Sequence, residues 1–193
     1  MFTVIDPKYQ CFYTFPISHF MELIKSRAYF GLSKQDQNRA TFVLLEDEEK
    51  GVCGGALLLK KRLSGFPHEV ANTLSDFVSP KDYVWKCMVF LSFEKDSPLC
   101  TTNEGDHFCQ IFYRNLYNTL VEFGKKEGTG FLCVSLDSVE HLCTEEIICW
   151  PYIFELKPQN SSDGFFHGIL SLTGSQYEAY QKNWKGALFS VQK

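Results

Sequence analysis

Residues that can act as nucleophiles or bases are plentiful in this chain, but they form no known catalytic motif. A serine nucleophile needs a histidine and an acid beside it, and the Gly-x-Ser-x-Gly turn that often presents one does not occur. The histidines stand in unrelated contexts typical of packed or surface residues, at positions 19, 68, 107, 141 and 167. Acidic runs at residues 46–49 and 145–146 are typical of solvated turns or helix faces. Neither nucleophilic catalysis nor a pair of catalytic carboxylates is indicated.

The cysteines do not indicate a metal or a disulfide framework. Neither a Cys-x-x-Cys pair nor a histidine at zinc-ligand spacing accompanies the cysteines, which stand at positions 11, 53, 87, 100, 109, 133, 143 and 149. Most of them fall within apolar patterns, where a free thiol packs as a small hydrophobe. The first residues lack the charged and apolar regions of a signal peptide. We therefore expect a reduced, cytoplasmic protein with free thiols and no metal site.

The loop at residues 100–106 is a candidate ligand site because it immediately precedes a long amphipathic pattern. A helix N-terminus presents unpaired N–H groups that suit a phosphate, so Thr101, Thr102 and Gly105 are candidate cofactor-binding residues. The same loop contains Glu104 and Asp106, which would instead cap the helix. Both interpretations remain open.

Composition excludes two classes of partner. The net charge is −4, and no basic run is longer than Lys60-Lys61-Arg62, whereas nucleic-acid binding requires a clustered positive surface. No apolar run approaches the ~18 residues of a membrane span. The 18 phenylalanines and 9 tyrosines favour an aromatic-rich core or, alternatively, an apolar cavity for a ligand. We expect no nucleic-acid partner and no membrane insertion.

Hydrophobic periodicity predicts a single domain over residues 1–193, with strands first and then helices and strands in alternation. Strands are expected at residues 41–45, 52–60, 84–93, 130–136 and 165–172. Helices are expected at residues 19–27, 70–77, 106–124 and 139–149. Residues 1–16 are expected to be extended, Ser18 to cap the first helix, and residues 33–40 to form a polar loop.

This order of elements predicts an acyltransferase-like α/β domain. We expect a mixed, mostly antiparallel central sheet flanked by helices, with a parallel strand pair beside the long helix. Residues 84–93 are almost all apolar, which indicates a central strand covered on both faces. Gly54-Gly55 within a strand indicates either a bulge or close backbone packing, or a place where a ligand approaches the main chain.

Several segments together resemble the acyl-homoserine-lactone synthases, autoinducer-making relatives of the GCN5-related N-acetyltransferases. These segments lie at residues 54–59, 84–90, 121–128, 133–136 and 140–150. The resemblance implies a bacterial enzyme that joins an acyl chain from acyl carrier protein or acyl-CoA to the amine of S-adenosylmethionine and then closes a lactone. It also implies a V-shaped split between central strands, where an acyl-phosphopantetheine arm adds like an extra strand.

The residue pattern of that family is only partly present. Trp85 and Phe90 match its central strand, and Arg27 and Asp36 match its N-terminal arginine and acid. Arg27, Asp36 and Trp85 are therefore the implied substrate-binding residues. The family's other charged or polar residues are replaced by Leu57, Lys86, Met88 and Val89. These replacements remove a base and the bidentate partners of carboxylates, so we do not expect lactone synthesis by the family's mechanism.

Acyl transfer in this superfamily needs little from side chains. Backbone N–H groups can hold the thioester carbonyl, and a water chain can deprotonate the amine. The resemblance implies that Val89, Phe90 and Leu91 form the strand that binds acyl-CoA or acyl-phosphopantetheine. Tyr152 is the candidate that returns a proton to the leaving thiolate.

Three functions remain open. The first is an N-acyltransferase with an unidentified amine acceptor, served by a small-molecule or acyl-carrier ligand. The second is a non-catalytic binding module that keeps the acyltransferase fold and cleft, which the loss of the family's charged residues favours. The third is a different α+β domain, which would lack splayed central strands. The sequence fixes no oligomeric state.

Overall fold

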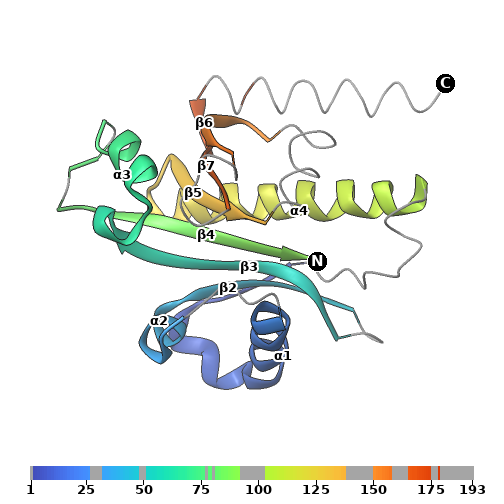
Figure 1. Ribbon diagram of the computed structural model, residues 1–193. Coiled ribbons are helices and arrows are strands. Elements are labelled where there is room, and N and C mark those ends of the chain that lie inside the picture. The colour runs from blue at the N-terminus through green and yellow to red at the C-terminus, as the bar shows by residue number, and fades with distance from the viewer. Residues whose placement is uncertain are drawn as a thin grey trace.

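The computed structural model describes residues 2–26, 32–47, 51–76, 78–79, 81–91, 103–137, 150–157, 165–174 and 178. Its strands are β1 (Phe2–Ile5), β2 (Thr41–Asp47), β3 (Gly51–Arg62), β4 (Tyr83–Leu91), β5 (Phe131–Leu136), β6 (Tyr152–Leu156) and β7 (Phe166–Ser171). Its helices are α1 (Thr14–Ser26), α2 (Lys34–Arg39), α3 (His68–Leu74) and α4 (Asn103–Glu127), with short 3₁₀ helices η1 (Pro7–Phe12) and η2 (Leu63–Gly65) (Figure 1).

The described strands form one seven-stranded sheet in the order β1-β2-β3-β4-β5-β7-β6. Strands β4 and β5 are parallel, and the other neighbouring pairs in this sheet are antiparallel. Parallel neighbours need a crossover connection, and the chain between β4 and β5 contains α4. The mixed, mostly antiparallel sheet and the parallel pair beside the long helix are therefore confirmed.

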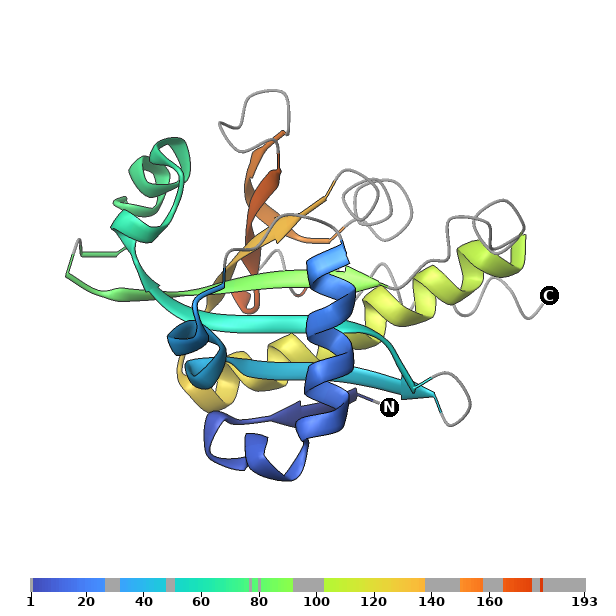
Figure 2. The same cartoon turned by 60° about the horizontal axis from the view of Figure 1, so that its bottom comes forward.

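Helices cover both faces of the sheet (Figures 1 and 2). On the face that we call the α4 face, Leu116 of α4 packs in one cluster with Leu58 of β3 and Val134 of β5. On the opposite face, the α1 face, Phe20 meets the ring of Phe42 in β2, with centroids 6.2 Å apart. Figure 2 shows α1 lying across the strands on the side away from α4.

Strand β4 is buried from both sides. Cys87, Val89 and Leu91 belong to the cluster on the α4 face, whereas Met88 and Phe90 belong to the cluster on the α1 face. Each of these side chains is buried. The prediction of a central strand covered on both faces is confirmed.

Gly54 and Gly55 allow β3 to approach both of its neighbours closely. A Cβ on Gly55 would overlap the carbonyl oxygen of Val43 in β2, and one on Gly54 would lie 2.8 Å from the carbonyl oxygen of Phe90 in β4. The β2–β3 ladder also shifts its register after Leu45, next to these glycines. Close backbone packing beside a bulge is therefore the interpretation that the structure confirms.

The N-terminal region corrects three predictions. Residues 1–16 are not extended throughout, because η1 follows β1, and α1 begins at Thr14. Ser18 consequently lies inside α1 and does not cap it, while Pro16 is accommodated in the first turn, where its missing N–H has no helical acceptor. Residues 33–40 are not a loop: the Ser33 hydroxyl accepts a hydrogen bond from the Asp36 N–H at 3.0 Å and caps α2.

The long helix extends beyond its expected limits at both ends. It begins at Asn103, and it continues past Gly124 to Glu127. Gly124 lies within the helix, and its missing Cβ leaves room for the side chain of Leu172. The helix ends before Gly128, whose φ of 67° is the left-handed conformation that favours glycine. The helix expected at residues 139–149 lies outside the described residues, and β6 was not anticipated.

Candidate functional site

The two edges of β4 are paired over very different lengths. Along one edge, β4 pairs with β3 over nine residues. Along the other, it pairs with β5 over three residues that end at the pair Met88–Ser135. Beyond this pair β4 continues through Val89, Phe90 and Leu91. The ladder therefore ends at Met88–Ser135, one residue before β5 itself ends at Leu136, and we call the place beyond this pair the β4–β5 split.

The end of the β4–β5 ladder lies where the resemblance implied a V-shaped split, and its use as a ligand site stays a prediction. Val89, Phe90 and Leu91 lie on its β4 arm, as expected, and their role in binding a thioester stays a prediction. Gly105 lies in the first turn of α4. Thr101 and Thr102 are outside the described residues.

One row of side chains crosses all seven strands at the closed end of the split. Register pairs connect its members without a break, in the order Ile5, Phe42, Leu57, Met88, Ser135, His167 and Leu156. Directly paired residues point to the same side of a sheet, so this row lies on the α1 face. Ser135 and His167 are its polar members.

Ser135 and His167 form a buried hydrogen-bonded pair. The Ser135 Oγ lies 2.9 Å from the His167 Nδ1, and the two residues are 3% and 1% exposed. Either atom can be the donor, because the tautomer of the imidazole decides which of them carries the proton. Sequence reasoning missed this pair. The residues are 32 positions apart, and only the β5–β7 register shows that they are neighbours.

The two cysteine thiols in the parallel β4–β5 ladder are not nucleophiles in this arrangement. Cys87 points to the α4 face and Cys133 to the α1 face, and both are buried. Burial raises the pKa of the Cys133 thiol to about 12, and it raises the pKa of Cys87 even further. Both groups are therefore neutral thiols near pH 7.

No cluster of three histidine, cysteine or acidic side chains suited to a metal ion occurs among the described residues.

Trp85 and Asp36 lie at the end of β4 opposite to the split. Both line one cavity of about 720 Å³, between η1, α2, strands β2–β4 and the C-terminal end of α4. The Trp85 ring packs edge-on against Phe123, with centroids 4.8 Å apart, and the Lys60 ammonium lies 4.7 Å from the Trp85 ring centre. The structure thus brings these two predicted substrate-binding residues together, away from Val89–Leu91. Arg27 lies outside the described residues.

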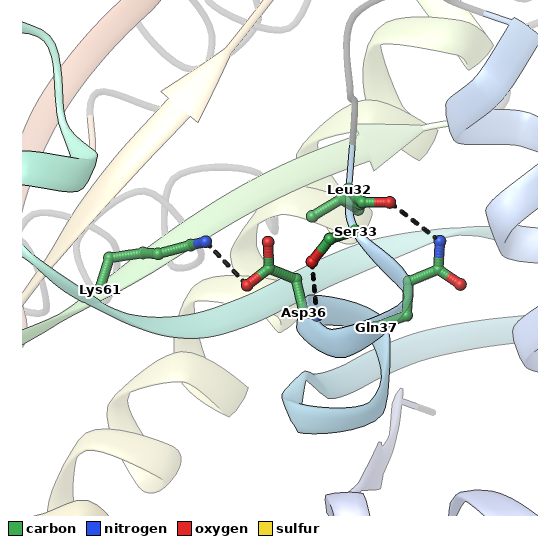
Figure 3. A network of polar contacts seen from close by, with 5 residues as sticks. All are labelled: Leu32, Ser33, Asp36, Gln37 and Lys61. Atoms are coloured by element: carbon green, nitrogen blue, oxygen red, sulfur yellow. Dashed lines mark hydrogen bonds and ion pairs between the residues drawn. The ribbon is translucent and has the colours of Figure 1, made fainter.

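Two contacts hold Asp36 in place, an ion pair with Lys61 and a hydrogen bond from its backbone N–H to the Ser33 hydroxyl at the start of α2 (Figure 3). Its carboxylate accepts a hydrogen bond from the Lys61 ammonium at 2.8 Å, which also forms an ion pair. This contact is the main reason that the pKa of Asp36 lies below its usual value, with a smaller contribution from Ser33. Asp36 is therefore ionised at neutral pH and is already paired with a cation.

Tyr152 lies on β6, at the edge of the sheet. Strands β5 and β7 stand between β6 and β4, which corresponds to a separation of roughly 14 Å at ordinary strand spacing. The Tyr152 ring packs against Phe166 and Trp150, with centroids 5.1 and 6.3 Å away. The structure does not bring Tyr152 to the β4 arm of the split, and its catalytic role stays a prediction.

A second cavity of about 570 Å³ opens on the α4 face. It lies between α4 and the ends of β1, β2 and β3, where its lining includes Phe2, Cys53 and Ile111. Register connects Phe2 through Leu45 and Gly54 to Leu91, so this cavity is at the same end of the sheet as the split.

None of the helices among the described residues has the length and apolar character of a membrane span.

Comparison with known proteins finds similarity in structure. No family model matches the sequence, and no curated protein matches it significantly. The solved structure of MesI, a CoA-dependent acyl-homoserine lactone synthase, is similar with a TM-score of 0.53 and 16% identity, over 96% of this chain and 95% of that chain. FeeM, an N-acyl amino acid synthase from uncultured soil microbes, gives 0.52 and 10%, over 89% and 95%.

A further CoA-dependent acyl-homoserine lactone synthase, BjaI, solved with S-adenosylmethionine and isopentyl-CoA, gives a TM-score of 0.51 and 11% identity, over 95% of this chain and 88% of that chain. At such identities the likeness establishes the fold. The chain therefore has the acyltransferase-like fold of these acyl-transferring synthases, as expected, and the alternative of a different α+β domain is not supported.

Proposed function

We propose that this protein is an N-acyltransferase that takes its acyl group from a thioester of CoA or acyl carrier protein. The observation that carries the proposal is the β4–β5 split. Strand β4 continues past its last pair with β5, so an extended chain with amide groups can lie along its arm. A phosphopantetheine arm is such a chain.

The β4 arm suits thioester chemistry because it offers backbone groups in an apolar setting. Val89, Phe90 and Leu91 are all buried. A backbone N–H that points at the thioester carbonyl stabilises the oxyanion of the tetrahedral intermediate strongly where water is excluded. Holding the amine and the thioester together supplies much of the remaining rate enhancement.

The acceptor in this proposal differs from S-adenosylmethionine. Leu57, Met88 and Val89 stand where the resembling family has an arginine, a serine and an arginine, and they are buried among apolar neighbours. No charged side chain at these positions is available to bind a carboxylate or to polarise an amine. The same replacements favour the second candidate, a binding module that keeps the split without turnover.

Thermal unfolding with a panel of ligands tests the proposal. The panel holds CoA, acetyl-CoA, C8 and C14 acyl-CoA and S-adenosylmethionine, with ATP as a control for charge and adenine. A ligand at ~100 times its dissociation constant adds about 2.7 kcal/mol of stability, which corresponds to a shift of roughly 5–10 °C in a chain of this size.

We expect a shift with acyl-CoA that exceeds the shift with ATP and grows with the acyl chain. Formation of an N-acyl product, measured by mass spectrometry with a set of amines, distinguishes an enzyme from a binding module. If no acyl-CoA raises the melting temperature more than ATP does, the proposed function is wrong. Binding without amide formation for any amine selects the binding module.

A further inference from the structure

We infer that the cavity of about 720 Å³ lined by Trp85 and Asp36 is a second ligand site, which takes a planar aromatic ring that carries a carboxylate or a phosphate. We call it the Trp85 cavity. The inference does not rest on the proposed function, because the cavity lies at the end of β4 opposite to the split. Trp85 precedes Val89 by four residues, which corresponds to about 13 Å along the strand. A ligand in this cavity therefore lies away from a thioester on the β4 arm.

The wall of the Trp85 cavity is built from segments that are distant in the sequence. Its residues come from the start of η1, from α2, from the adjoining ends of β2, β3 and β4, and from the last turn of α4. Ion pairs connect these segments, since Asp6 binds Lys126 at 2.9 Å and Glu127 binds Lys60 at 3.4 Å. The first pair joins η1 to α4 and the second joins α4 to β3. The cavity is thus held together across its segments, and its volume is typical of a small-molecule site.

The charged residues of the lining leave a positive excess. They are four cations and three acids, namely Lys8, Arg39, Lys60, Lys126, Asp6, Asp36 and Glu127. Each acid has a lysine partner, because Asp36 pairs with Lys61 at 2.8 Å. Within the part of the chain that the structure describes, Lys8 and Arg39 have no acidic partner. The whole chain carries a net charge of −4, so this local excess does not follow from its composition. A cleft with an excess of one charge concentrates ligands of the opposite charge.

Arg39 is the residue that we expect to bind the anionic group. It is the last residue of α2, and its side chain lines the cavity. A guanidinium group presents its N–H donors in a planar fork, which matches two oxygens of a carboxylate or a phosphate. Lys8 adds a second positive charge from the start of η1, where its ammonium lies 4.7 Å from the ring centre of Tyr9. The two cations together suit a singly or doubly charged anion.

Tyr83 and Trp85 provide the aromatic part of the cavity. They are two residues apart on β4, so their side chains lie on the same side of the sheet. Arg62 lies over the Tyr83 ring, 5.3 Å from its centre, and donates a hydrogen bond to the Tyr83 hydroxyl at 3.2 Å. The Tyr83 side chain is nevertheless 56% exposed, so its ring is oriented and still accessible. A planar ring can pack against it, which is an arrangement that aromatic groups favour.

Titration calorimetry on the full chain tests the inference, with 2-naphthoate and 2-naphthyl phosphate as the probes. We expect at least one of them to bind about tenfold more tightly than 2-naphthamide, which lacks the charge, and than acetate or inorganic phosphate, which lack the ring. The tighter of the two probes identifies the anionic group. Arg39→Gln is expected to weaken its binding by about 10- to 100-fold, because a charge-assisted hydrogen bond is lost. Tyr83→Leu is expected to weaken it by about 2- to 10-fold.

Lys34→Gln is the matched control for Arg39→Gln. Lys34 lies on the same helix and is exposed, but it is not part of the cavity lining. The two variants remove the same charge from α2, so an attraction that depends only on net charge would weaken equally in both. We expect the affinity of Lys34→Gln to stay within about twofold of wild type, because exposed charges outside the site are screened. Melting temperatures of the three variants show whether each is folded.

Three results would overturn the inference. The first is that neither naphthalene anion binds more tightly than 2-naphthamide, and the second is that folded Arg39→Gln keeps the wild-type affinity. The third is an equal loss in Lys34→Gln and Arg39→Gln.

Octanoyl-CoA separates this inference from the proposed function. We expect its affinity to be the same in wild type and Arg39→Gln, because the split and the Trp85 cavity lie at opposite ends of β4. A loss in Arg39→Gln would mean that the cavity holds part of CoA, and the inference of a second site would be wrong. If octanoyl-CoA does not bind the wild-type protein while a naphthalene anion does, the proposed function fails and the inference stands.

Discussion

Along its β3 edge, β4 forms a ladder of nine register pairs, whereas along its β5 edge it forms three. The first edge brings backbones so close that Gly54 has no room for a side chain. Along the second edge the ladder ends at Met88, while β4 continues to Leu91. One strand thus combines a long ladder along one edge with a short ladder along the other, and the proposed thioester would lie beyond the short one.

The β5 edge of β4 depends on packing more than the β3 edge does. Three pairs in a parallel ladder stabilise little by themselves, so the two halves of the sheet depend on the helix that spans them. On the α4 face, one cluster joins Leu58 of β3 and Val134 of β5 to Leu116 of α4. The two halves of the sheet on either side of the β4–β5 split are therefore joined by side-chain packing against α4.

The largest expected effect comes from the rigid edge. A methyl group in Gly55→Ala would overlap the Val43 carbonyl oxygen, so β2 and β3 would have to move apart. We expect a loss of at least about 4 kcal/mol in the free energy of unfolding, measured by urea denaturation.

Gly65→Ala is the control for Gly55→Ala. The nearest atoms to its Cβ belong to the Lys61 side chain, 3.4 Å away and beyond, which is ordinary contact. This variant is expected to change stability by less than about 0.5 kcal/mol. Equal losses in both variants would mean that close packing of the β2–β3 ladder is not what makes this edge rigid.

Thiol labelling compares the reactivity of a buried cysteine in the β4–β5 ladder with that of an exposed cysteine. Because burial raises the pKa of Cys133 to about 12, roughly one molecule in 10,000 carries the thiolate at pH 8, against about a quarter for an ordinary thiol. We expect iodoacetamide to modify Cys133 at least ~1,000-fold more slowly than the exposed Cys11, measured by peptide mass spectrometry. The rate at Cys133 should rise with pH towards 12. Similar rates at both cysteines would show that the β4–β5 ladder opens freely.

The fold could be predicted from the sequence where burial imposes a pattern. Strands β2–β5 and β7 and the body of α4 have continuous or periodic apolar residues, and the structure places them within a few residues of expectation. Helix α2 was missed because none of its residues is buried, so its sequence carries no apolar stripe. Its start depends on the Ser33 cap, which looked like part of a polar loop.

The site was predicted less well, because register decides it. The arm of the split was found from the apolar run that includes Val89. The Ser135–His167 pair was not found, since two residues 32 positions apart become neighbours only when β5 and β7 align. Trp85 and Asp36 were expected to bind substrate, and they line one cavity at the end of β4 opposite to the split, where that role stays a prediction.

A hydrogen bond from α4 to the far half of the sheet tests how the open edge is held. The Tyr117 hydroxyl donates to the Ser171 carbonyl of β7 at 2.7 Å, and the tyrosine is fully buried. Tyr117→Phe leaves that carbonyl without this donor, so we expect a loss of about 1–2 kcal/mol in unfolding free energy. Tyr83→Phe, on an exposed tyrosine, is the matched control and should cost less than about 0.5 kcal/mol. Equal costs would mean that α4 is not anchored to β7 by this bond.

The smallest effect is expected at the ion pair that joins α2 to the rigid half of the sheet. Asp36→Asn keeps an oxygen that can accept from Lys61 but removes the charge, so we expect a loss of about 0.5–1 kcal/mol at pH 7. The pKa of Asp36 is lowered by folding, so its contribution is complete above the unfolded pKa of about 3.9. It disappears as the pH falls through the lowered value in the folded protein. Urea denaturation should therefore show the difference from wild type at pH 7 and not at pH 2.

Glu122→Gln is the control for Asp36→Asn. It removes a carboxylate that is 71% exposed and pairs with Lys125, and it should change stability little at either pH. A deficit for Asp36→Asn that persists at pH 2 would show that packing, and not charge, fixes α2 against β3.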